Sequence, residues 1–109
     1  MFNTSLNNAG HGQLVKSYRN GSSFYRVYSD GYCEQGGIVE NTAGSGVLLT
    51  QHLLIEYIDT DYIVFLQAIS NNAQNATPIV GSTKTTSTFQ YYFGTVSNNL
   101  MWWACGYVK

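Results

Sequence analysis

The strongest constraint on the fold comes from residues 22–37, which read SSFYRVYSDGYCEQGG. They predict two short β-strands, 24–28 and 32–35, joined by Ser-Asp-Gly at 29–31 and ended by a pair of glycines. An Asp-Gly step between aromatic and β-branched runs is the strongest hairpin signal that a short sequence can give. This part of the chain is therefore expected to form an antiparallel hairpin.

The length of the hairpin loop decides which side chains face one another. A three-residue loop that ends on a left-handed glycine places Arg26 opposite Glu34 and Tyr28 opposite Tyr32. A two-residue loop places Arg26 opposite Gln35 instead. We favour the first register, because opposite charges and paired aromatic rings across two strands stabilise a sheet. Arg26 and Glu34 are predicted to form a structural salt bridge, within the hairpin or between chains; a sugar-binding pair is the alternative.

Further strand signals follow along the chain. Residues 13–19 turn through Asn-Gly at 20–21 into the hairpin, with two serines widening the loop, so 13–35 predicts a three-stranded meander. The remaining predicted strands are 47–55, 62–69, a run opened by Pro78, 84–93 and 101–108. Short strands of this number, separated by frequent turns, predict an all-β fold, an antiparallel β-sandwich of about seven or eight strands.

Composition limits the classes of function. The chain has 109 residues, which is enough for one domain with one core. Charged residues make up only 10%, well below the usual quarter, and uncharged polar residues replace them. A net charge of −1 lacks the basic surface that drives nucleic-acid binding. No apolar run is long enough to span a bilayer, so membrane insertion is not expected. The surface suits a protein that works outside a cell and meets neutral polar partners.

The cysteines and histidines give no metal-binding pattern. Cys33 and Cys105 stand alone in the sequence and are predicted as two buried thiols; a disulfide between the hairpin and the last strand is the alternative. Neither His11 nor His52 has a second ligand nearby. His11 lies in a Gly-His-Gly lead-in and His52 on the polar side of a predicted strand. No metal site and no cofactor are expected.

The carboxylates do not predict catalysis. Glu56, Asp59 and Asp61 lie within six residues of one another, but they lack the spacing and the glycine of a calcium loop. They are predicted to lie in a solvated turn, and the chain shows no credible pair of catalytic carboxylates for glycoside hydrolysis. A non-enzymatic protein is therefore expected.

Three stretches are distinctive: the run SYRNGSSFYRVYSDGYCEQGG, the TDY that precedes IVFLQAI, and the ending WWACGY. Together they resemble bacteriophage tail-fibre C-terminal domains over roughly residues 13–107. Phe24 stands where that family usually has tryptophan, and Tyr32 stands where tryptophan is also common. The resemblance implies a β-sandwich tip domain at 13–109, preceded by a lead-in or fibre connection at 1–12. It also implies a homotrimer at the distal tip of a virion's tail fibre.

Alternation along the last two strands separates their aromatic residues. Phe89, Tyr91 and Phe93 share one face, whereas Trp102 and Trp103 lie on opposite faces. Both faces cannot be core in a lone sandwich of this size. One set is therefore exposed, buried between subunits or stacked on a ligand, and subunit burial is the favoured reading for the two tryptophans.

The resemblance implies attachment of a phage, or of a prophage-derived particle, to a host surface. We expect recognition of a bacterial cell-surface polysaccharide, a lipopolysaccharide or an outer-membrane protein, without chemistry. The alternative is a structural trimerisation cap, with recognition in another domain. Polar loops and outward aromatic rings are the candidate ligand contacts, namely Tyr92, Trp102, Asn71, Asn72, Asn75, Asn98 and Asn99. The hairpin is expected to specify the fold rather than to contact the host.

Overall fold

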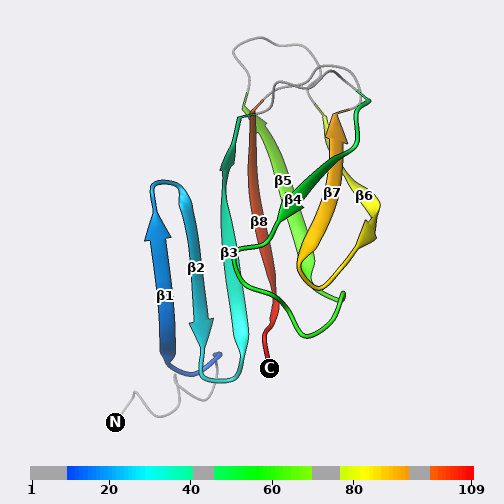
Figure 1. Ribbon diagram of the computed structural model, residues 1–109. Helices are drawn as coiled ribbons and strands as arrows, with labels where there is room; N and C mark the ends of the chain where they lie inside the picture. Colours follow the sequence, from blue (N-terminus) through cyan, green and yellow to red (C-terminus); the bar gives the residue numbers. More distant parts are fainter. Residues whose placement is uncertain (1–9, 41–45, 70–76, 94–98) are drawn as a thin grey trace.

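The computed structural model describes residues 10–40, 46–69, 77–93 and 99–109, and every regular element in these ranges is a β-strand (Figure 1). The strands are β1 (Leu14–Asn20), β2 (Ser23–Tyr28), β3 (Tyr32–Val39), β4 (Leu49–His52), β5 (Ile63–Ile69), β6 (Pro78–Lys84), β7 (Thr88–Phe93) and β8 (Asn99–Tyr107). They pair antiparallel in two sheets, ordered β1-β2-β3-β8-β5 and β4-β7-β6. The predicted all-β sandwich is confirmed. The described residues contain no helix that could cross a membrane.

The hairpin has the register that the three-residue loop predicts. Arg26 pairs with Glu34, and the rings of Tyr28 and Tyr32 lie 6.0 Å apart between centroids. Gly31 takes a φ of 91°, and its N–H donates to the Tyr28 carbonyl at 2.8 Å. The Asp30 carboxylate accepts from the Tyr32 N–H at 2.9 Å, which closes the turn.

Two local predictions about the meander are wrong. Strand β3 does not end at Gly36 and Gly37 but continues through both to Val39. A Cβ on Gly36 would lie 2.3 Å from the Trp102 carbonyl oxygen, so the glycine allows β3 and β8 to approach closely. The first turn is also tighter than expected: Asn20 pairs directly with Ser23, which leaves a two-residue loop.

The core lies between β3, β8 and β5 on one side and the small sheet on the other. Its fully buried side chains include Phe89 and Phe93 from β7 and Leu100 from β8. The predicted strand at 47–55 is shorter than expected, since only Leu49–His52 is strand. The irregular segment after it brings the buried rings of Tyr57 and Tyr62 under the sheet, where they stack at 4.6 Å.

One buried polar side chain ties this irregular segment to the sheet. Gln35 is fully buried, and its Oε1 accepts from the N–H groups of Leu54 at 2.7 Å and Ile55 at 3.1 Å. Its Nε2 donates to the Ile55 carbonyl at 2.9 Å. These bonds satisfy backbone groups that have no strand partner, as burial requires.

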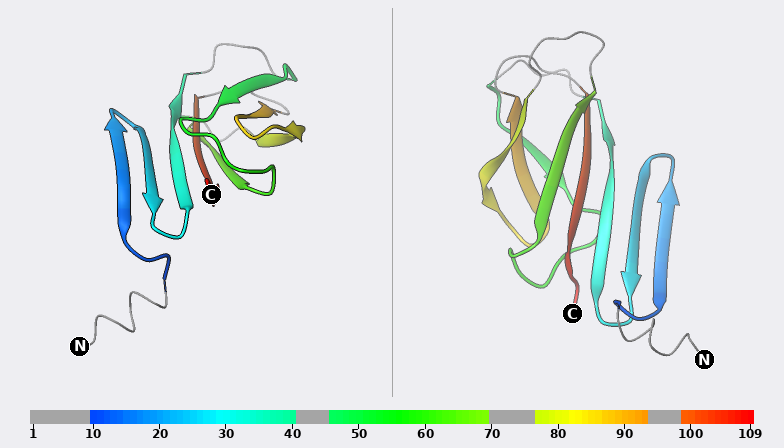
Figure 2. Two further views of the ribbon diagram at one scale, coloured as in Figure 1. Left: turned by 60° about the horizontal axis from the view of Figure 1, so that its bottom comes forward. Right: turned by 180° about the vertical axis from the view of Figure 1, so that it is seen from behind.

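Strands β1 and β2 extend beyond the small sheet, and we call this pair the flange (Figures 1 and 2). Every residue of β1 is exposed, including Tyr18 and Leu14. The ring of Tyr18 stacks on Tyr25 of β2 at 5.3 Å. The flange therefore projects from the sandwich as the outer two strands of the five-stranded sheet, and only Val27 of its residues is buried.

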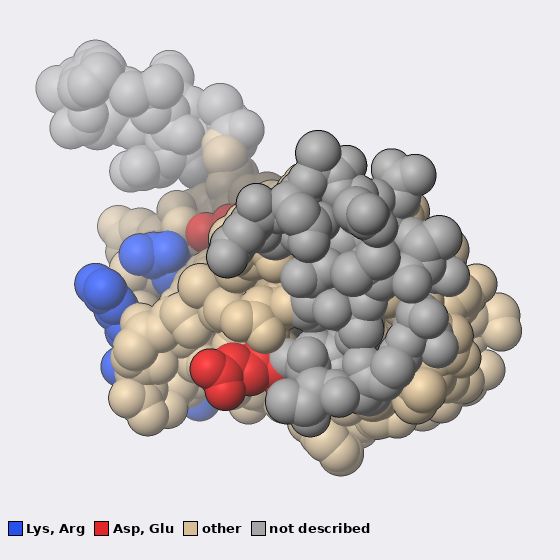
Figure 3. All heavy atoms as spheres, turned by 90° about the horizontal axis from the view of Figure 1, so that it is seen from above, with Lys and Arg blue, Asp and Glu red and all other residues tan. Residues whose placement is uncertain are grey.

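The two ends of the molecule differ. At the apical end, the ends of strands from both sheets come together at Val39, Ile69, Pro78, Phe93 and Asn99 (Figure 1, top). Seen from above in Figure 3, Lys and Arg are confined to the flange side of the visible described surface. At the basal end lie the β2–β3 turn, residues 10–13 and the end of β8.

Candidate functional site

The prediction that Trp102 contacts a ligand is wrong. Its side chain is 5% exposed and lies between the sheets, 5.5 Å from the Phe89 ring between centroids. Leu100, Trp102 and Ala104 of β8 are all buried, which shows that the even-numbered residues at this part of the strand point inward. The outward tryptophan is Trp103, which is 37% exposed.

Two of the other candidate contacts, Tyr92 and Asn99, lie in strands that reach the apical end. Tyr92 is half-buried on β7, where it pairs with Ile79 of β6, and Asn99 is exposed at the start of β8. The remaining candidates, Asn71, Asn72, Asn75 and Asn98, lie outside the described residues. The strand ends that flank their segments meet at the apical end (Figure 1).

Arg26 and Glu34 are neighbours without an ion pair. They pair across β2 and β3 as predicted, but no salt bridge joins these two described residues. The guanidinium of Arg26 instead lies 5.7 Å from the centroid of the Phe24 ring. The predicted salt bridge within the hairpin is therefore wrong, although the register is right; a bridge between chains stays a prediction.

Cys33 and Cys105 are free thiols. Glu34, not Cys33, is the residue that pairs with Cys105, so the two cysteines lie on opposite faces of the sheet. This arrangement contradicts the disulfide alternative within one chain. Burial raises the pKa of Cys33 to about 11, which keeps that thiol protonated and unreactive at neutral pH.

The outward face of β5 and β8 is apolar, and we call it the outer face. Phe65 and Trp103 stack there at 5.3 Å, and their neighbours Ile63 and Met101 are 55% and 40% exposed. Neither strand contains a charged residue. A hollow of about 300 Å³ lies on this face, lined by Phe65, Leu66, Gln67, Met101, Trp102 and Trp103. A lone soluble domain rarely exposes so continuous an apolar surface.

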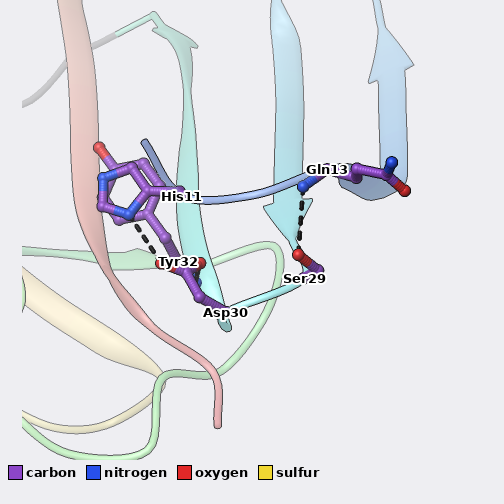
Figure 4. A network of polar contacts seen from close by, with 5 residues as sticks. All are labelled: His11, Gln13, Ser29, Asp30 and Tyr32. Carbon is purple, nitrogen blue, oxygen red and sulfur yellow. Dashed lines mark hydrogen bonds and ion pairs between the residues drawn. The ribbon is translucent and has the colours of Figure 1, made fainter. Parts of the chain in front are cut away.

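An aromatic cluster lies at the basal end, and no spacing in the sequence indicates it. The His11 ring stacks face to face on Tyr32 at 3.8 Å, and its Nδ1 lies 2.8 Å from Asp30 Oδ2 (Figure 4). Tyr107 meets both rings edge-on. The sequence places His11 in a Gly-His-Gly lead-in, whereas in the structure it packs against the hairpin. Gly12 turns the chain there at a φ of 82°.

The Asp30 carboxylate in this cluster favours its ionised form. Desolvation opposes ionisation, but the Tyr32 N–H and the contact with His11 outweigh it, so the pKa of Asp30 is lowered. Beside it, the Ser29 N–H donates to the Gln13 carbonyl at 2.8 Å, and the Gln13 N–H donates to Ser29 Oγ at 3.1 Å (Figure 4). Several contacts thus hold the incoming chain to the β2–β3 turn.

The acidic segment is a turn, as predicted. The Asp61 N–H donates to Asp59 Oδ1 at 2.9 Å, and Glu56 accepts a hydrogen bond from Thr86. His52 is exposed at the end of β4. Over the ranges that the structure describes, no three His, Cys, Asp or Glu side chains are placed to hold a metal ion.

The fold is similar to that of two solved tail-fibre fragments. A C-terminal fragment of the R2 pyocin fibre of P. aeruginosa matches with a TM-score of 0.68 and 19% identity, over 87% of this chain and 26% of that chain. An N-truncated R2-type pyocin tail fibre matches with a TM-score of 0.66 and 19% identity, over 93% of this chain and 46% of that chain. The chain thus spans less than half of either fragment. No family model and no curated protein match the sequence.

Proposed function

We propose that this chain is a tail-fibre tip domain that attaches a phage, or a prophage-derived particle, to a bacterial surface. The observation that carries the proposal is the fold shared with two pyocin tail-fibre fragments over 87% and 93% of the chain. The receptor is a surface polysaccharide, a lipopolysaccharide or an outer-membrane protein, bound without chemistry. The domain acts outside the producing cell, at the distal tip of the fibre.

The surface chemistry supports recognition of neutral polar partners. Charged residues make up only 10% of the chain, whereas tyrosine and tryptophan rings are exposed at several places, among them Tyr107 and Trp103. Rings of this kind combine an apolar face with a hydrogen-bonding group, which suits partly apolar, hydroxyl-rich ligands. The Asn-rich segments flanked by the apical strand ends are further candidate contacts.

The proposed assembly is a homotrimer. The outer face supports this proposal because its exposed rings and aliphatic side chains, such as Phe65 and Ile63, need cover. The flange supports it too, because β1 is an edge strand that is exposed along its whole length and gains stability from a neighbour. Both surfaces would be covered if copies of the chain packed around a common axis.

A structural trimerisation cap is the second candidate function. The same outer face favours it, since subunit packing accounts for the exposed aromatic residues without any ligand. In that case recognition would lie in another part of the fibre.

Cell binding separates the two functions. Fluorescently labelled protein is incubated with a panel of Gram-negative strains and with an array of bacterial polysaccharides and lipopolysaccharides. Attachment predicts saturable binding to particular strains. If the receptor is a glycan, purified lipopolysaccharide or polysaccharide from those strains abolishes the binding. If the receptor is a protein, deletion of one outer-membrane protein abolishes it. An oligomer that binds no strain and no glycan would contradict attachment and favour the cap.

A further inference from the structure

The basal end contains a cavity that none of the predicted contacts lines. It has a volume of about 350 Å³, at the small end of the range for ligand pockets. It lies between the turn that precedes β5 and the end of β8. Its walls are formed by Ile58, Asp59, Asp61, Tyr62, Gly106, Tyr107 and Lys109.

The frame of this basal cavity is held by backbone hydrogen bonds. The Ile58 N–H donates to the Tyr107 carbonyl at 2.9 Å, and the Val108 N–H donates to the Gly31 carbonyl at 2.8 Å. Tyr107 is therefore fixed between the acidic turn and the hairpin turn. The Asp59 carboxylate holds the acidic turn itself through the Asp61 N–H. A site built on fixed elements binds a ligand with little loss of conformational freedom.

The lining combines apolar surface with outward polar groups. Tyr107 and Ile58 are 44% and 54% exposed, so both offer apolar surface to a ligand. The Tyr62 hydroxyl has no proton left to donate to a ligand, because its one O–H group lies 2.7 Å from the carbonyl oxygens of both Thr85 and Thr88. Two carboxylates and one ammonium group remain, from Asp59, Asp61 and Lys109.

These groups match the chemistry of a sugar ring. Carboxylate oxygens accept hydrogen bonds from hydroxyl groups, and the ammonium group donates to hydroxyl or ring oxygens. The C–H face of a pyranose can pack on the Tyr107 ring. A phosphate or an acidic sugar fits poorly, since two carboxylates outnumber one ammonium group. Calcium needs six to eight oxygen ligands, which this lining does not offer.

We infer that the basal cavity binds one neutral hexose unit of a bacterial surface polysaccharide. The inference rests on the proposed attachment function and names both the ligand class and the site. It places saccharide recognition at the basal end, away from the strand ends at the apical end.

The test is a titration of the isotope-labelled protein followed by NMR amide shifts. The probes are glucose, galactose, mannose, rhamnose and N-acetylglucosamine, each added up to tens of millimolar. At least one sugar is expected to shift the amides of Ile58, Asp61, Gly106 and Tyr107 in a saturable way. No saturable shift with any sugar, or shifts confined to the apical strand ends, would overturn the inference.

Two variants and one control make the test specific. Tyr107→Ala and Asp61→Asn are each expected to weaken binding at least tenfold. Tyr18→Ala removes a tyrosine of similar exposure, 41%, from the distant flange and is expected to leave binding unchanged. Asp61→Asn keeps the test valid if Tyr107→Ala disturbs the fold. Wild-type affinity in both cavity variants would contradict the inference.

The result of the sugar titration and the result of the cell-binding experiment can be told apart. A protein that binds cells but shifts no basal amide with sugar would keep the attachment function and lose the basal site. A protein that binds no cell and no polysaccharide would lose the attachment function itself.

Discussion

The sandwich and the flange are built from similar residues but are stabilised differently. In the sandwich, Phe89, Leu100 and Trp102 are buried between two sheets. In the flange, Tyr18 and Leu14 are as apolar as many core residues, yet they are 41% and 49% exposed. The sandwich buries its apolar side chains within one chain, whereas β1 is an edge strand that is exposed along its whole length. The difference supports the proposal that another copy of the chain covers the flange, whereas the core of the sandwich lies within one chain.

The largest expected effect separates the two adjacent tryptophans. Trp102→Ala removes a buried ring from the sandwich and is expected to lower the free energy of unfolding by about 3–5 kcal/mol. Trp103→Ala removes an outward ring and is expected to reduce self-association while leaving the far-UV circular dichroism unchanged. Denaturant titration and sedimentation measure the two effects. Equal losses of unfolding free energy in both variants would contradict the inward and outward assignment.

The second largest expected effect concerns the hydrogen bonds of the buried Gln35 side chain. Gln35→Leu leaves three backbone groups of Leu54 and Ile55 without their partner and is expected to lower the free energy of unfolding by roughly 2–4 kcal/mol. Gln67→Leu, on the outward side of β5, is the control and is expected to change it by less than about 0.5 kcal/mol. Similar values for both, measured by denaturant titration, would mean that the Gln35 hydrogen bonds contribute little.

A third comparison uses the turns of the two regions. Gly31→Ala strains a residue with a φ of 91° and places a Cβ 2.8 Å from the Lys109 carbonyl oxygen. It is expected to lower the free energy of unfolding by more than the roughly 1–2 kcal/mol of the left-handed backbone alone. Gly21→Ala in the flange turn has a φ of 61° and no contact within 4 Å. Gly21→Ala is therefore expected to lower the free energy of unfolding only by the cost of the left-handed backbone. Thermal melting compares the two variants.

The smallest expected effect is in the flange. Tyr18→Ala loses one stacked cross-strand pair and is expected to lower the free energy of unfolding of the isolated chain by about 0.2–1 kcal/mol. Hydrogen exchange of β1 is the more sensitive measurement, because local opening is seen there before global unfolding. A loss above about 2 kcal/mol would show that the flange belongs to the same cooperative unit as the sandwich.

The sequence predicts local structure well and the choice of buried face poorly. The register of Arg26 and Glu34 follows from loop length and turn chemistry, which neighbouring residues determine. Alternation likewise separates Phe89, Tyr91 and Phe93 from Tyr92, as the structure confirms. Alternation cannot decide between Trp102 and Trp103, because both faces of β8 are apolar and only the position of the small sheet tells them apart.

Contacts between distant segments were also beyond prediction. His11 packs on Tyr32 because Gly12 and the Ser29–Gln13 hydrogen bonds bring two separate segments together, and no spacing in the sequence indicates this. The basal cavity has the same origin, since its walls come from two segments that are more than 40 residues apart. The sequence predicts the acidic turn, but the position of this turn beside Tyr107 depends on the fold.

The mass of the unmodified protein in solution tests most directly whether other copies complete the flange and the outer face. Sedimentation equilibrium at tens of micromolar measures it without labels or variants. A trimer predicts three times the 12.1 kDa of one chain, with dissociation only on strong dilution. A single species of 12.1 kDa at that concentration would contradict assembly through these two surfaces.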